Sequence, residues 1–145
     1  MISIVKATEE HLPGILGIGQ EAISPSWTYS FLLTEFNKCD SQFFVAINND
    51  VIGFVVLRQV GDDGEILQIA VDKSARRGGV GDLLMVAALD YSREREFGSV
   101  FLEVRKGNIA AICLYEKHGF ELIRTRKDYY NNPIEDAIIM KREIK

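Results

Sequence analysis

The sequence predicts a single α/β domain built on a mixed sheet with helices on both faces. Three observations support this prediction. Strand-like and helix-like segments follow one another in the order β-α-α-β-β-β-α-β-α-β-β. Three consecutive strands are joined by short turns, which indicates an antiparallel meander, and a later strand–helix–strand unit indicates a crossover between parallel strands. A chain of 145 residues has the length of one domain, and we expect residues 1–145 to form it.

The N-terminal half should hold the first two helices and the meander. The expected elements are a strand at 2–7, a helix capped by Thr8, a helix from Ser26, and strands at 42–47, 51–59 and 65–71. The Asn-Asn-Asp sequence at 48–50 suits a hairpin turn, because these residues tolerate a positive φ. The segment 65–71 does not alternate cleanly between apolar and polar residues, which indicates burial on both faces or a β-bulge.

The C-terminal half should supply two more helices and three strands. The expected elements are a helix at 80–98 that Gly98 ends, a strand at 99–105, a helix from an Asn108 cap to a Gly119 stop, and strands at 120–126 and 135–143. The segment KDYYNNPI, between the last two strands, is predicted to be a loop.

Charge and composition exclude several classes of protein. The net charge of −4 at pH 7 argues against nucleic acid as a direct ligand. Cys39 and Cys113 lack the spacing of a metal site, and two histidines cannot make a His-rich one, so no metal is predicted. We find no apolar segment with the length of a signal peptide or a membrane span, and we expect a reduced, cytoplasmic protein that binds no membrane.

The segment ARRGGVGD (residues 75–82) lies between a predicted strand and a predicted helix. Glycines at such a place let backbone N–H groups approach a ligand, and the helix N-terminus favours an anion such as a phosphate. The segment matches neither GxxxxGK[ST] nor GxGxxG, since Asp82 follows Gly81 and Leu84 stands where the last glycine would be. It matches Arg/Gln-x-x-Gly-x-Gly/Ala instead.

This last pattern resembles the pyrophosphate-binding signature of the GNAT superfamily of acetyl-CoA-dependent N-acetyltransferases. LEVRKGNIAAICLYEKHGF, then RTRKDYY and EDAIIMKR, are similar to the bacterial ribosomal-protein alanine N-acetyltransferases and their N-terminal acetyltransferase relatives. The resemblance is specific from about Ile66 to Met140. It implies acetyl-CoA as co-substrate and a protein N-terminus as acceptor, with an alanine-starting ribosomal protein as the candidate. The sequence departs from the pattern at Asp82, whose charge would oppose a nearby phosphate.

The resemblance also implies where the coenzyme lies. The strands at 65–71 and 99–105 should be parallel neighbours that separate at their C-terminal ends, with the coenzyme in the gap. Backbone groups of the first strand would hold the pantetheine arm and the acetyl carbonyl, and the glycine loop would hold the pyrophosphate. Asn108 would add a hydrogen bond, although from its position alone it is a helix cap. The implied coenzyme-binding set is Ile69, Ala70, Val71, Arg76, Arg77, Gly78, Gly79, Val80, Gly81, Asp82 and Asn108.

Glu103 and Tyr115 are the predicted catalytic residues. Acetyl transfer to an amine needs a group that removes a proton from the amine and one that protonates the departing thiolate. Partial burial of Glu103 would suit it to be the general base, and the alternative is a glutamate paired with Arg105. The resemblance implies that Tyr115 is the general acid rather than only a core tyrosine. It also implies that Tyr129 and Tyr130 line the acceptor channel, the alternative being simple turn aromatics.

Three functions remain compatible with these residues. The first is acetylation of a protein N-terminus, and the second is acetylation of a small amine such as a polyamine or an aminoglycoside. The third is a module that binds acyl-CoA without catalysis. Retention of both Glu103 and Tyr115 argues against the third, because a binding module needs neither. The tyrosine pair favours the first over the second.

Overall fold

The computed structural model describes residues 1–23 and 25–145, and its elements follow the predicted order. The strands are β1 (Ser3–Lys6), β2 (Ser41–Asn48), β3 (Asp50–Val60), β4 (Asp63–Val71), β5 (Ser99–Arg105), β6 (Glu121–Tyr130) and β7 (Glu135–Glu143). The helices are α1 (Leu12–Ala22), α2 (Tyr29–Phe36), α3 (Val80–Glu94) and α4 (Ile109–Lys117), with short 3-10 helices η1 (Glu9–His11) and η2 (Lys73–Ala75). Within these described ranges, no helix combines the length and the apolarity needed to cross a membrane.

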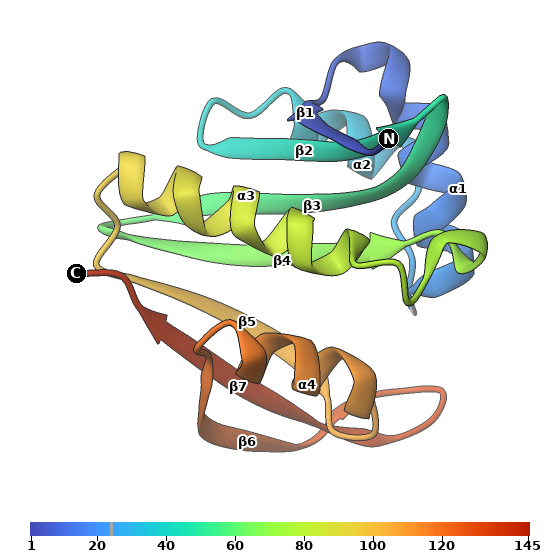
Figure 1. Cartoon of the computed structure of the whole chain (residues 1–145). Helices are drawn as coiled ribbons and strands as arrows, with labels where there is room; N and C mark the ends of the chain where they lie inside the picture. The colour runs from blue at the N-terminus through green and yellow to red at the C-terminus, as the bar shows by residue number, and fades with distance from the viewer. Residues whose placement is uncertain (24) are drawn as a thin grey trace.

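The strands form one mixed sheet in the order β1-β2-β3-β4-β5-β7-β6. The neighbouring pairs are antiparallel except for β4 and β5, which are parallel as predicted. The parallel pairing ends at Ile66 and Leu102, although β4 continues to Val71 and β5 to Arg105. The two strands therefore separate toward their C-terminal ends, as Figure 1 shows, and this separation is the feature that positions the site.

Each face of the sheet carries its own apolar core. One core joins α1 and α2 to strands β2 to β4, and the other joins α3 and α4 to strands β2 to β5 and β7 (Figure 1). Alternation along β3 assigns Val55 to the α3–α4 side and Val56 to the α1–α2 side. In the described part of the chain, the α1–α2 core includes no residue of β5, β6 or β7. That side of β5 is therefore not sealed by this core.

Three helix boundaries differ from the prediction. Helix α1 begins at Leu12 with His11 as its N-cap, and the predicted cap Thr8 instead precedes the 3-10 helix η1. Helix α2 begins at Tyr29 rather than Ser26, because the Thr28 side chain accepts a hydrogen bond from the Phe31 N–H (3.1 Å) and caps it there. Helix α3 ends at Glu94 rather than Gly98, and Glu96 already takes a left-handed φ of 57°. The boundaries that we predicted from turn residues are confirmed, with φ values of 68° at Asn49 and 88° at Gly119.

Among the strands, one predicted irregularity is confirmed and one boundary differs. The irregularity predicted in β4 is a bulge at Leu67, since Val56 pairs with Gln68 whereas Leu57 pairs with Ile66. Strand β6 runs to Tyr130, so the two tyrosines predicted to lie in a loop belong to the strand. Its register with β7 is irregular between residues 126 and 130, and Tyr130 at its end pairs with Glu135.

Candidate functional site

A cavity of about 570 Å³ opens where β4 and β5 separate, a volume typical of small-molecule sites. Its lining comes from the end of α1, the segment before α2, strands β4 and β5, the start of α4 and the end of β6. Its polar and ionisable lining residues include Glu65, Gln68, Glu103, Arg105, Asn108, Tyr115, Tyr129 and Tyr130. Within residues 1–23 and 25–145, no three His, Cys, Asp or Glu side chains are placed to share a metal ion.

The two predicted catalytic residues both line this cavity. Along β5 the apolar residues Val100, Leu102 and Val104 are buried in the α3–α4 core, so the alternating Glu103 lies on the opposite side of the strand. Tyr115 belongs to α4 and to that same α3–α4 core. A single cavity can reach both side chains because the sheet is open between β4 and β5.

Burial dominates the electrostatics of Tyr115. The residue is 6% exposed and its ring packs against Phe120, with the ring centroids 6.0 Å apart. Burial raises the pKa of the Tyr115 hydroxyl strongly, and the neighbouring Tyr130 raises it further. The hydroxyl therefore keeps its proton throughout the neutral and mildly basic range, where it can act as a proton donor.

Arg105 holds Tyr130 at the cavity, and the Tyr130 ring in turn contacts that of Tyr129. Its guanidinium lies 4.3 Å from the centroid of the Tyr130 ring and 3.3 Å from Glu135 Oε1, and it donates to backbone carbonyls of the β6–β7 turn. The Tyr129 and Tyr130 rings meet edge to face at 5.1 Å. Burial, followed by the charge of Glu103, raises the pKa of Tyr130 above its ordinary value.

The glycine loop between η2 and α3 has the geometry expected for an anion site. Arg77 and Gly79 take left-handed φ values of 68° and 82°, and Gly79 is the N-cap of α3. Apart from Gly79 and its two chain neighbours, no atom of the described residues lies within 4 Å of the position that a Cβ on Gly79 would take, so the backbone can be approached. The N–H groups of Val80, Gly81 and Asp82 have no partner inside the helix. These features fit a pyrophosphate.

The C-terminal part of β4 offers an open edge. Ile69, Ala70 and Val71 pair with β3 on one side, and on the β5 side of β4 no described residue pairs with the strand after Ile66. The bulge lies at Leu67, before this segment, so the open edge comes from the separation of β4 and β5 and not from the bulge. An extended ligand can still pair there as an added strand.

Two charged residues of the predicted coenzyme set have partners within the protein. Arg76 forms an ion pair with Glu21 of α1 (2.8 Å) and donates to the carbonyl of Val71. Asp82 accepts from His118 Nε2 (2.8 Å) and from Lys117 Nζ (3.1 Å), which joins the start of α3 to the end of α4. The negative charge of Asp82 is thus paired with two basic side chains of the protein. Gly78 lies exposed in the loop, and the side chain of Val80 is buried in the core.

The ion pairs of Asp82 predict a pH-dependent contribution to stability. The hydrogen bond from His118, followed by that from Lys117, lowers the pKa of Asp82 below its ordinary value of 3.8. A lowered pKa stabilises the fold above the ordinary value, and the effect is lost as the pH falls through the folded-state value. In thermal unfolding, Asp82→Asn should have a lower Tm than the wild type at pH 6. The difference between the two Tm values should disappear as the pH falls below 3.8. Asp90→Asn, which breaks only an exposed pair with Arg93, should show little difference at either pH.

Sequence reasoning missed part of the cavity wall. Glu65 and Gln68 of β4 and Trp27 before α2 line the cavity but were not predicted as site residues. One signal could have identified Glu65. It is a charged residue at the start of a strand whose apolar sequence predicts burial on both faces. Trp27 carried no such signal, because its apolar spacing is also typical of a helix packed on a core.

The chain is similar over most of its length to acetyltransferases. Residues 11–120 match the acetyltransferase (GNAT) family. The chain is 33% identical to the ribosomal protein bS18-alanine N-acetyltransferase of Escherichia coli strain K12, over 96% of this chain and 94% of that protein. It is 30% identical to the N-alpha-acetyltransferase of Saccharolobus solfataricus, over 95% of this chain and 90% of that protein. The crystal structure of the ribosomal-protein-S18-alanine N-acetyltransferase from E. coli matches with a TM-score of 0.92 at 31% identity, over 100% of this chain and 95% of that one.

Proposed function

Because the chain belongs to the GNAT family of acetyltransferases, we propose that it acetylates the N-terminal α-amine of a protein. The enzyme class, an acetyl-CoA-dependent N-acetyltransferase, is that of the family and of the similar proteins. The observation that carries the proposal is the single cavity between β4 and β5. It has a carboxylate on one side of the sheet, a buried tyrosine on the other and two tyrosines on its wall.

Glu103 is the general base of the proposed reaction. An α-amine has a pKa near 8 and is mostly protonated at neutral pH, so it must lose a proton before it can attack. What supports this role is that Glu103 lines the same cavity as Tyr130, and that its charge is one of the causes of the raised pKa of Tyr130. There it can take the proton from the α-ammonium group directly or through one water molecule.

Tyr115 is the general acid. Acetyl-CoA supplies the thioester whose carbonyl carbon the amine attacks. The Tyr115 hydroxyl donates its proton to the sulfur as the thiolate leaves, and burial keeps that proton in place until then. The open edge of β4 from Ile69 to Val71 provides N–H groups that can polarise the carbonyl oxygen.

The remaining coenzyme contacts are assigned to the loop and to α4. Residues 76–82 would hold the pyrophosphate through backbone N–H groups and the α3 N-terminus. Asn108 Oδ1 caps α4 by accepting from the Ala111 N–H (3.2 Å), and the residue also lines the cavity. One amide can do both, since its oxygen caps the helix while its NH₂ group is the donor for the coenzyme.

A substitution at Gly79 should separate coenzyme binding from stability. Gly79→Ala places a methyl group in the open space in front of the loop, and Gly61→Ala is the matched control. Both glycines have a positive φ (82° and 62°) and open space around the Cβ position, but Gly61 lies at the β3–β4 turn. Each variant should lose about 1 kcal/mol of stability. Calorimetry should show about tenfold weaker acetyl-CoA binding for Gly79→Ala alone, the cost of one lost bond to a charged group. Equal acetyl-CoA affinities for the Gly79→Ala and Gly61→Ala variants would show that the loop does not bind the pyrophosphate.

The similar proteins guide the choice of acceptor. The E. coli relative is named for the alanine of ribosomal protein bS18, and the archaeal relative for an α-amine. We therefore propose an alanine-starting ribosomal protein as the acceptor, met in the cytoplasm, with Tyr129 and Tyr130 lining its channel. The proposal includes no direct contact with nucleic acid and no membrane.

A competition between amines tests this proposal. The enzyme would be given acetyl-CoA with an unblocked Ala-starting peptide, the same peptide with a blocked N-terminus, spermidine or free lysine, and thiol release would be followed. We expect rapid release with the unblocked peptide and only background release with the blocked one. Faster release with spermidine or lysine would overturn the N-terminal acceptor and leave acetylation of a small amine.

A further inference from the structure

Glu65 is a second carboxylate in the cavity and has no part in the reaction described above. We infer that Glu65 determines acceptor specificity by selecting peptides with a lysine or arginine directly after the N-terminal residue. Arg58 and the buried Glu35 hold Glu65 in place for this purpose. The inference rests on the proposed function, because it concerns the same acceptor.

The sheet places Glu65 on the same side as Glu103. Glu65 of β4 pairs with Phe101 of β5 in the parallel ladder, so both point to one face, and Glu103 follows Phe101 by two residues. The two glutamates lie on neighbouring strands and are offset by two residues along the strand direction. This offset places their Cα atoms about 8 Å apart. Both residues line the cavity. An acceptor whose amine lies at Glu103 therefore has a second anionic group one residue away.

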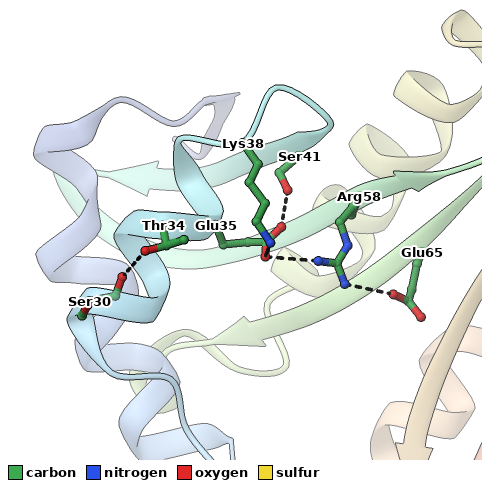
Figure 2. A network of polar contacts seen from close by, with 7 residues as sticks. All are labelled: Ser30, Thr34, Glu35, Lys38, Ser41, Arg58 and Glu65. Carbon is green, nitrogen blue, oxygen red and sulfur yellow. Dashed lines mark hydrogen bonds and ion pairs between the residues drawn. The ribbon is translucent and has the colours of Figure 1, made fainter.

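A network of ion pairs anchors Glu65 (Figure 2). Arg58 of β3 is the cross-strand neighbour of Glu65, and its guanidinium lies 3.7 Å from Glu65 Oε1 and 3.4 Å from Glu35 Oε1. Glu35 of α2 is 1% exposed, and a buried carboxylate must be paired and hydrogen-bonded to remain charged. Its other partners are Lys38 Nζ (3.3 Å) and the Ser41 hydroxyl, which donates to Oε2. Glu35 thus fixes Arg58, and Arg58 fixes Glu65.

The network presents its negative end to the cavity. The two carboxylates and two basic groups of the network together carry no net charge. Glu65 lies at the end that lines the cavity, and Lys38 lies at the other end with its side chain 43% exposed. The guanidinium of Arg105, also in the lining, forms an ion pair with Glu135 and stacks on Tyr130. A cationic acceptor side chain would therefore meet a carboxylate at Glu65, where a charge-assisted hydrogen bond can form.

The spacing favours the second residue of the acceptor. Its Cα lies 3.8 Å from that of the first residue, and the four-carbon stem of a lysine covers the rest of the span to Glu65. The first residue cannot make this contact if it is alanine, because its methyl group carries no donor. Glu65 would then report the identity of residue two while Glu103 acts on the amine.

Two peptides that differ at one position test the inference. They begin Ala-Lys and Ala-Gln and are otherwise identical and free of lysine, and kcat/KM is measured for each. Wild type should favour the Ala-Lys peptide about tenfold, mainly through KM, the value of one charge-assisted hydrogen bond. Glu65→Gln should bring the ratio of kcat/KM for Ala-Lys over Ala-Gln close to one. Glu65→Lys should instead prefer a third peptide that begins Ala-Glu over the Ala-Lys peptide, because the charge at this position is reversed. Glu94→Gln, an exposed change at the end of α3, should keep the wild-type ratio.

The positioning role of Arg58 has its own variant. Arg58→Lys keeps the charge but loses the fork that reaches both carboxylates, so the preference for Ala-Lys should fall while thermal unfolding shows a folded protein. A wild-type ratio of one would overturn the inference and leave the proposed function intact. An equal drop in kcat for both peptides in Glu65→Gln, with a shifted pH profile, would also overturn it, because Glu65 would then be a base. Acetylation of neither peptide would refute the proposed function and the inference together.

Discussion

Replacing Tyr115 with phenylalanine is expected to lower kcat about 100-fold or more, the usual contribution of a general acid. The substitution removes only the hydroxyl, and the ring keeps its place against Phe120. Coenzyme affinity should change little, because the hydroxyl acts on the sulfur only as the thiolate forms. Stopped-flow or steady-state thiol release measures kcat, and calorimetry measures the Kd for acetyl-CoA.

Tyr91→Phe is the matched control for this experiment. Tyr91 lies on α3 between Phe44 and Phe97 and outside the cavity lining, so loss of its hydroxyl should leave turnover intact. Because burial raises the pKa of Tyr115, its ionisation should cause no loss of wild-type activity below about pH 10. Wild-type turnover in Tyr115→Phe would remove the residue from the chemistry.

Glu103→Gln should also lower kcat about 100-fold, with a distinct pH dependence. The amide cannot accept the proton, so the variant depends on the fraction of acceptor amine that is already neutral. With an α-amine pKa near 8, that fraction rises roughly fivefold between pH 7 and pH 8, about doubles again by pH 9 and then levels off. Activity of the variant should therefore recover in part toward pH 9. Glu94→Gln serves again as the control, and a deficit that stays constant from pH 6 to pH 9 would argue against Glu103 as the base.

Local patterns in the sequence predicted most of the fold. Asn49 and Gly119 ended their elements because each adopts a left-handed φ that few residues tolerate. Alternation along β5 can be read directly from the letters, and in the structure it places Glu103 opposite the buried Val100, Leu102 and Val104. The position of the bulge could not be predicted, because it depends on which β3 residue pairs with Gln68.

The partnerships within the site could not be predicted, for a different reason. Asp82 meets His118 across 36 residues, and Arg58 meets Glu35 across 23. Each of these side chains looks in the sequence like an ordinary surface charge, and only the packing of helices on the sheet brings them together. Tyr129 and Tyr130 were predicted to line the channel, but the extension of β6 that carries them depends on pairing with β7.

The central claim is that the acetyl group goes to an N-terminal α-amine. The most direct measurement is fragment mass spectrometry of a peptide with a free N-terminal alanine and an internal lysine, after reaction with acetyl-CoA and the enzyme. We predict a mass increase of one acetyl group confined to the fragments that contain the N-terminus. An acetyl group on the lysine side chain, with the N-terminal alanine unmodified, would contradict the proposed function.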